Sequence, residues 1–270
     1  MFPALLASWT KLRRPALFWG TYGALAVVSV LITTLIFVNA SESAVAPRGG
    51  PAGPPGQGTT TLAELAGSNG LLTGLSISVM LIGVVALCVA ASQMAGEYTQ
   101  GTLRNLLIRR PQRLQLLGGT WAALVTFMAG AVAVAAIASA VTALTAAQAK
   151  GIDTSAWFSG DGRTSALQTL GEIAVAIAGY TTLGAALGSI LRAPVVAVAV
   201  AIGWLLPIEQ ILGSVIDGSD RWLPGSLLTT IASGGTATVA LGAALVTTAT
   251  YLAVAMGAAG VLFKRRDVTA

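Results

Sequence analysis

The stretch LQLLGGTWAALVTFMAGAVAVAAIASAVTALTAAQA, residues 114–149, contains no Asp, Glu, Lys or Arg. A helix needs about 20 apolar residues to cross the hydrocarbon core of a bilayer, so this stretch is long enough for one span. Four further stretches are also free of charged residues: 15–41, 65–96, 193–208 and 222–263. Such runs are too continuous for the alternating strands of about 10 residues in a transmembrane barrel. The sequence therefore predicts an all-α, polytopic membrane protein.

The composition supports this class and argues against an enzyme. Hydrophobic residues make up 55% of the chain and charged residues 9%. The chain has no His and a single cysteine, Cys88, which excludes a His-ligated metal site and an internal disulfide. No clustered carboxylates complete a catalytic constellation. We therefore expect no enzymatic activity, no metal and no cofactor on this chain.

Segments rich in Pro, Gly or polar residues divide the chain into spans. Residues 39–69 hold four prolines and six glycines, a composition that predicts a flexible outer loop. Residues 150–163 read as a short polar loop, and Arg192-Ala193-Pro194 as a tight turn. We expect one transmembrane domain, 1–270, with spans at about residues 16–38, 70–94, 117–146, 165–190, 195–216 and 237–262.

The last charge-free stretch, residues 222–263, is too long for one crossing. As a single helix it would extend about 63 Å, roughly twice the thickness of the hydrocarbon core. Pro224 and the sequence Ser233-Gly234-Gly235 interrupt the stretch. We therefore predict a shallow helical dip on the outer side before the sixth span.

The N-terminal segment, residues 1–15, combines apolar residues at helical spacing with a basic end. Such a pattern predicts an amphipathic helix that lies in the membrane interface and leads into the first span. A basic leader without a stable helix is the alternative. The apolar positions are Phe2, Leu5, Leu6, Trp9 and Leu12, and the basic ones are Lys11, Arg13 and Arg14.

Basic residues indicate the orientation of the spans. With six spans both termini lie on one side, and we take this side to be the cytoplasm. Of the fifteen Lys and Arg, Arg48, Lys150, Arg163 and Arg221 would then lie outside, which leaves eleven inside. This bias follows the positive-inside rule. It also explains the net charge of +5 without nucleic acid as a partner.

The linker EYTQGTLRNLLIRRPQR, residues 97–113, lies on the cytoplasmic side in this topology and is unusually rich in charge. Leu103, Leu106 and Leu107 share one face of a short helix that Thr102 can cap. An amphipathic helix at the membrane surface can bind lipid headgroups or a groove on a protein. The residues alone leave both alternatives open.

The linker resembles the signature that follows the second span of bacterial ABC type-2 permeases. In that family six spans follow an interfacial helix, and the segment corresponding to residues 96–113 is a coupling helix that rests in a groove of a separate ATPase subunit. A re-entrant outer hairpin precedes the sixth span. Thr120 departs from the family pattern, which often has Lys at the start of the third span. The resemblance is carried by Glu97, Gly101, Thr102, Leu103, Arg104, Leu106, Leu107, Pro111 and Arg113.

The resemblance implies an ATP-driven exporter in the bacterial inner membrane, with both termini cytoplasmic. The chain has no G-x-x-x-x-G-K-[ST] phosphate loop, so ATP and Mg would bind a partner chain. The implied partners are two copies of an ABC ATPase subunit, a second copy of this permease or a related permease, and membrane lipids. The apolar spans favour amphipathic cargo such as a drug, a peptide or a lipid-like molecule. An ion-driven secondary transporter and a membrane scaffold are the alternatives.

Two acids lie within predicted spans, where a charge costs at least about 2.5 kcal/mol. Glu172 and Glu209 each lie about 10 Å from the predicted outer end of their helices. We predict that both line an outward vestibule on the export path, and that Pro207 kinks the fifth span beside it. The alternative is a structural role, with Arg221 in reach of Glu209.

Gly184 and Gly188 form a small-x-x-x-small step near the inner end of the fourth span. Glycine at this spacing lets two helix backbones approach closely. The sequence leaves open whether the partner helix belongs to the same chain or to a second copy.

Overall fold

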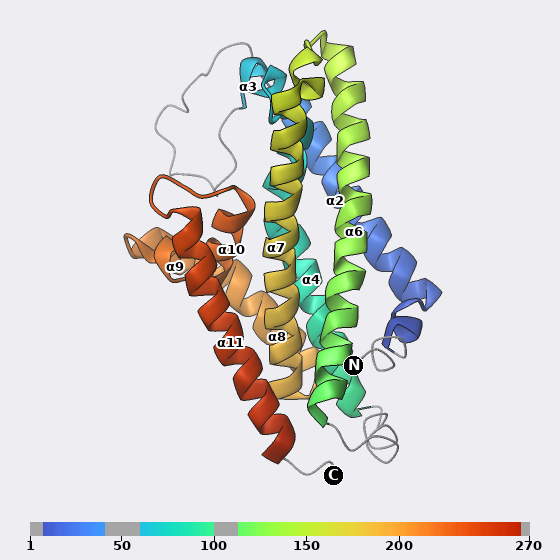
Figure 1. Ribbon diagram of the computed structural model, residues 1–270, viewed down its shortest axis with the longest axis vertical. Helices are drawn as coiled ribbons and strands as arrows, with labels where there is room; N and C mark the ends of the chain where they lie inside the picture. Colours follow the sequence, from blue (N-terminus) through green and yellow to red (C-terminus); the bar gives the residue numbers. More distant parts are fainter. Residues whose placement is uncertain (1–7, 41–59, 100–112, 266–270) are drawn as a thin grey trace.

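The computed structural model describes residues 8–40, 60–99 and 113–265, and within these ranges every regular element is helical (Figure 1). Six helical segments there are long and apolar enough to cross a membrane. The prediction of an all-helical chain with six candidate spans is therefore confirmed. These spans are formed by α2 (Pro15–Asn39), α4 (Thr73–Thr99), α6 (Arg113–Lys150), α7 (Gly160–Leu191), α8 with α9 (Pro194–Gly203 and Glu209–Val215) and α11 (Leu241–Arg265).

Consecutive spans run in opposite directions, so that α2 begins and α11 ends toward the same end of the bundle (Figure 1). Helices α4 and α7 are the most buried spans, whereas α2, α8 with α9, and α11 are the least buried. Helix α7 packs along α4 and also contacts α6, α10 and α11. The core therefore centres on the α4–α7 pair.

The helices α6 and α7 extend further than the apolar sequence predicts. At 38 residues, α6 is about 57 Å long, more than the roughly 45 Å of a bilayer with its headgroups. Helix α7 begins at Gly160 rather than near residue 165 because Ser159 caps its first turn, with Oγ 3.0 Å from the Gly162 N–H. Both helices rise above α9 and α10 in Figure 1.

Part of the predicted outer loop is helical. Residues Leu62–Ala66 form α3, whose first turn carries a reciprocal capping box between Thr61 and Glu64. The Trp157 indole donates a hydrogen bond of 2.9 Å to the Leu65 carbonyl and is buried against Phe37. A buried tryptophan thus fixes this short helix to the end of the bundle at which α2 ends and α7 begins. Residues 41–59 of the predicted loop lie outside the described residues.

The fifth span bends in its middle. A wide turn, Trp204–Ile208, joins α8 to α9 and contains Pro207, and the Glu209 N–H bonds to the Trp204 carbonyl five residues earlier. Proline cannot donate a backbone hydrogen bond, which favours such a break. The chain then continues through a short turn into α10 (Pro224–Ala232). At about 13 Å, this nine-residue helix is too short to cross a membrane.

Candidate functional site

An ion pair joins the N-terminal segment to the inner end of α4, meaning the end at which α2 begins and α11 ends. The Lys11 ammonium donates to both carboxylate oxygens of Glu97, at 2.8 and 2.9 Å, and both side chains are partly buried. Residues 8–12 are helical, and the buried Ser8 hydroxyl lies 3.2 Å from that of Thr120. The segment is therefore tied to both α4 and α6.

Most of the predicted coupling segment lies outside the described residues. Its described part consists of the last turn of α4, which contains Glu97 and ends at Thr99, and of Arg113, the first residue of α6. These two positions lie at the same end of the bundle as Lys11. The residues that fall outside are Gly101, Thr102, Leu103, Arg104, Leu106, Leu107 and Pro111.

Beside Glu97, the turn between α7 and α8 reaches α4 through Arg192. The guanidinium carbon of Arg192 lies 4.9 Å from the centre of the Tyr98 ring. The Tyr98 ring in turn meets Phe263 of α11 edge to face, with centroids 6.0 Å apart. The sequence marks Arg192 only as part of a turn, so this contact between three helices was missed.

Gly184 and Gly188 lie in the contact between α7 and α4. A Cβ atom on Gly184 would lie 2.3 Å from the Leu87 carbonyl oxygen, and one on Gly188 would lie 2.4 Å from that of Ala91. Only glycine allows this approach without displacement of the neighbouring backbone. The predicted packing step therefore has its partner helix within the same chain.

Glu209, the first residue of α9, is 6% exposed and holds the first turn of α10. Its Oε1 atom accepts hydrogen bonds from the Trp204 indole at 2.7 Å and from the Gly225 N–H at 3.1 Å. The first N–H groups of a helix lack partners within it and carry partial positive charge. Glu209 thus caps α10 from a neighbouring helix. Within the described residues it forms no ion pair with Arg221.

The same glycine also contacts α7. The Tyr180 hydroxyl donates a hydrogen bond of 3.1 Å to the Gly225 carbonyl, and the Tyr180 ring lies against Gly83 of α4. A Cβ on Gly225 would lie 2.4 Å from Oε2 of Glu209, so a larger residue here would displace the Glu209 carboxylate. We name Tyr180, Trp204, Glu209 and Gly225 the α10 lock. Of these, the sequence singled out Glu209 alone.

Glu172, the second acid predicted to line the export path, lies at the opposite end of α10. Glu172 is half-buried on α7 and accepts a hydrogen bond of 3.0 Å from the Gln168 amide. Its carboxylate oxygens lie near Gly234, which follows α10 with a φ of +74°. The two acids are therefore separated by the length of α10 and do not contact each other. Their predicted place on an export path stays a prediction.

The chain belongs to the family described as Protein of unknown function (DUF2705), whose profile matches residues 26–269. The match includes five of the six candidate spans completely and most of α2. It begins after Lys11, so the N-terminal side of the Lys11–Glu97 pair lies outside it. A comparison with curated proteins finds no significant match.

Proposed function

We propose that the chain is the membrane-spanning permease subunit of an ATP-driven ABC exporter of the type-2 class. It would couple ATP hydrolysis on a separate subunit to export of an amphipathic, peptide, drug or lipid-like substrate. The observation that carries the proposal is the motif that starts at Glu97 and follows the second of six candidate spans. The Lys11–Glu97 ion pair supports it, since it holds the start of this motif against the bundle.

In this proposal two permeases, either identical or related, assemble with two ATPase subunits. Closure of the ATPases around ATP and Mg would displace residues 97–113, and the spans would switch between inward and outward access. The N-terminal segment would lie in the interface on the cytoplasmic side of a bacterial inner membrane. Helix α10, with the turns before and after it, would form the re-entrant outer hairpin between the fifth and sixth spans, a place that suits a short, buried helix.

An ion-driven secondary transporter is the second candidate, and Glu209 is the observation that favours it. A buried carboxylate in a candidate span is the kind of group that binds a coupling proton or cation. Its two hydrogen-bond donors and its position at the first turn of α10 give it a structural role as well. We therefore rank this function second.

The two functions differ in their partners, and gentle purification from native membranes followed by mass spectrometry separates them. We expect a P-loop ATPase with the native chain, and its loss from a variant with Glu97→Lys and Arg104→Glu. Asp161→Lys, a charge reversal at the outer end of α7, is the matched control and should retain the ATPase. Absence of an ATPase, with other membrane complexes intact, would contradict the exporter and favour the ion-driven carrier.

A further inference from the structure

The turn between α7 and α8 contains an arginine in a conformation that usually belongs to glycine. Arg192 ends α7 with a φ of +58° and is the one non-glycine residue with positive φ in the described part of the chain. Helices commonly end with glycine in this conformation, because a Cβ atom is disfavoured there. An arginine at this position therefore suggests that a contact of its side chain offsets the unfavourable backbone conformation.

That side chain joins the turn to the inner end of α4. Its guanidinium lies over the face of Tyr98, which immediately follows Glu97. A cation over an aromatic face is attracted by the ring electrons, and the planar guanidinium of arginine stacks well there. Within the described residues its Nε atom is buried without a hydrogen-bond partner. The contact that the structure describes for the guanidinium is the one with the Tyr98 ring.

The contact continues a longer line of contacts between the same two helices. Gly184, Gly188 and Arg192 follow each other at every fourth position, and the first two meet α4 at Leu87 and Ala91. Residues four apart lie on one face of a helix. One face of α7 and its terminal turn therefore follow α4 down to Tyr98.

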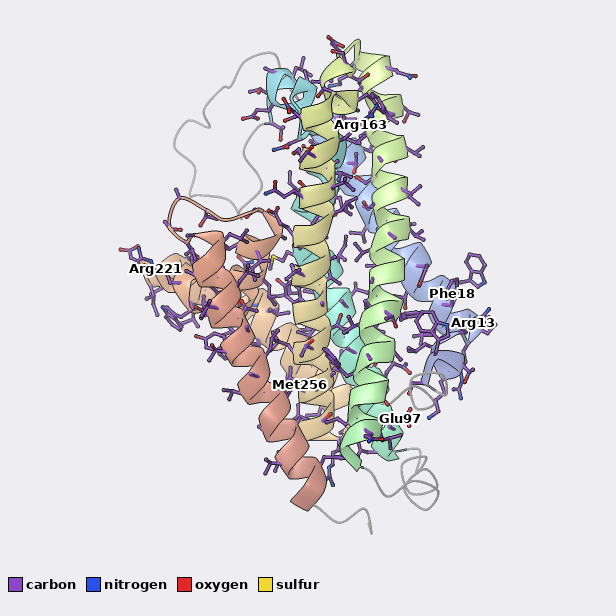
Figure 2. The ribbon with its side chains drawn as sticks, viewed as in Figure 1. Arg13, Phe18, Glu97, Arg163, Arg221 and Met256 are labelled. Atoms are coloured by element: carbon purple, nitrogen blue, oxygen red, sulfur yellow. The ribbon has the colours of Figure 1, made fainter. Side chains whose placement is uncertain are left out.

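At the other end of this line, α7 contacts the α10 lock. Tyr180 packs its ring on Gly83 of α4 and donates its hydroxyl hydrogen to the Gly225 carbonyl of α10. Figure 2 shows how far apart the ends are: Glu97 lies at the inner end of the bundle, and Arg221, close in sequence to α10, lies higher on the side of α9. Direct contacts therefore connect the inner end of α4 with α10.

We infer that Arg192 is a positioning residue that makes the inner end of α4 and the α7–α8 turn move together, so that a displacement of α4 reaches α10. The inference rests on the proposed function, in which an ATPase supplies the displacement. The Arg192–Tyr98 contact would transmit this movement to α7 and α8, which belong to the fourth and fifth candidate spans.

The test measures exposure at α10 in the complex with the co-purified ATPase. Cys88 is replaced by Ser, and Ser226→Cys places a single thiol in the first turn of α10, next to Gly225. A membrane-impermeant maleimide labels this thiol without nucleotide and with ATP, Mg and vanadate. With Arg192 present, we expect the labelling rate to change about fivefold or more, the lower end of typical coupling between sites.

Arg192→Gly should abolish this change while the ATPase still co-purifies. The midpoint of thermal unfolding should stay the same or rise, because glycine accepts the backbone conformation without strain. Tyr98→Leu should also abolish the change, whereas Tyr98→Phe keeps the ring and should preserve it. Arg163→Ala, at the outer end of α7, is the control and should leave the change intact.

Each other outcome contradicts the inference in a distinct way. A full labelling change in Arg192→Gly, or none in the chain that keeps Arg192, would overturn it while the co-purified ATPase still supports the proposed function. A lower midpoint of thermal unfolding in Arg192→Gly would assign the residue to folding alone. Absence of an ATPase from the native complex would overturn both.

Discussion

The Glu209 carboxylate accepts a hydrogen bond of 3.1 Å from the Gly225 N–H, so that an acid at the bend of the fifth candidate span caps the next helix, α10. The Tyr180 hydroxyl binds the carbonyl of the same glycine. Both backbone groups of Gly225 are therefore held by side chains from other helices. This arrangement explains how a nine-residue helix keeps a fixed place among much longer ones.

We expect Glu209→Ala to lower the free energy of unfolding by about 2–4 kcal/mol, because the Trp204 indole and the Gly225 N–H lose their acceptor. Glu209→Gln should cost less, about 1 kcal/mol, since both donors bond to Oε1 and an amide oxygen in its place can still accept from both, without the negative charge. Unfolding in detergent by heat or denaturant measures both. An unchanged free energy of unfolding in Glu209→Ala would show that Glu209 does not hold α10.

Glu172→Gln provides a matched comparison at the other end of α10. Its described hydrogen bond is to the neighbouring Gln168, so we expect the free energy of unfolding to change by less than about 0.5 kcal/mol. If Glu172 lines the export path, transport should nevertheless fall. Export by membrane vesicles, with the same variant checked for stability, measures this. Unchanged transport would remove Glu172 from the path.

The close approach of α4 and α7 predicts a large difference between two glycines of the same helix. In Gly184→Ala the new methyl group would lie 2.3 Å from the Leu87 carbonyl oxygen, which should destabilise the fold by about 1–3 kcal/mol. Gly171→Ala adds a methyl group with no atom within 4 Å and should be neutral or stabilising by up to about 1 kcal/mol. Equal effects in thermal unfolding would contradict this packing.

The Lys11–Glu97 pair predicts coupling between the N-terminal segment and α4. A double-mutant cycle with Lys11→Met and Glu97→Gln should give a coupling energy of about 0.5–1 kcal/mol, because both groups are partly buried and the Lys11 side chain is 33% exposed. The coupling should weaken at high salt. A coupling energy of zero from thermal unfolding would mean that the ion pair does not stabilise the fold.

The spans could be predicted because each one needs a long apolar run, whatever its neighbours are. Their ends were less predictable, since polar caps such as Ser159 extend a helix beyond its apolar part. The spacing of Thr61 and Glu64 is that of a capping box and could have predicted α3, but the many prolines and glycines of the segment favoured a flexible loop. The periodicity of apolar residues indicates the buried face of one helix but not which residue of another helix an acid will contact. The contacts of Gly225 with Glu209 and Tyr180 could therefore not be predicted from the sequence. The left-handed conformation of Arg192 could not be predicted for a different reason, because glycine is the usual residue in this conformation at the end of a helix.

The loop between α6 and α7 offers a test by pH. The Ser155 N–H donates a hydrogen bond of 2.9 Å to Asp153 Oδ1, and this bond, with a second from the Ser155 hydroxyl, lowers the pKa of Asp153 below its ordinary value of 3.8. A lowered pKa means that the ionised form stabilises the fold, so the stabilisation is complete above pH 3.8 and is lost as the pH falls through the lowered value. We expect an NMR titration of Asp153 to give a midpoint below 3.8. Ser155→Ala keeps the stronger backbone donor and should raise the midpoint only partly, whereas Ser155→Pro removes both donors and should return it to the ordinary value. A midpoint unaffected by Ser155→Pro would show that this turn does not perturb the carboxylate.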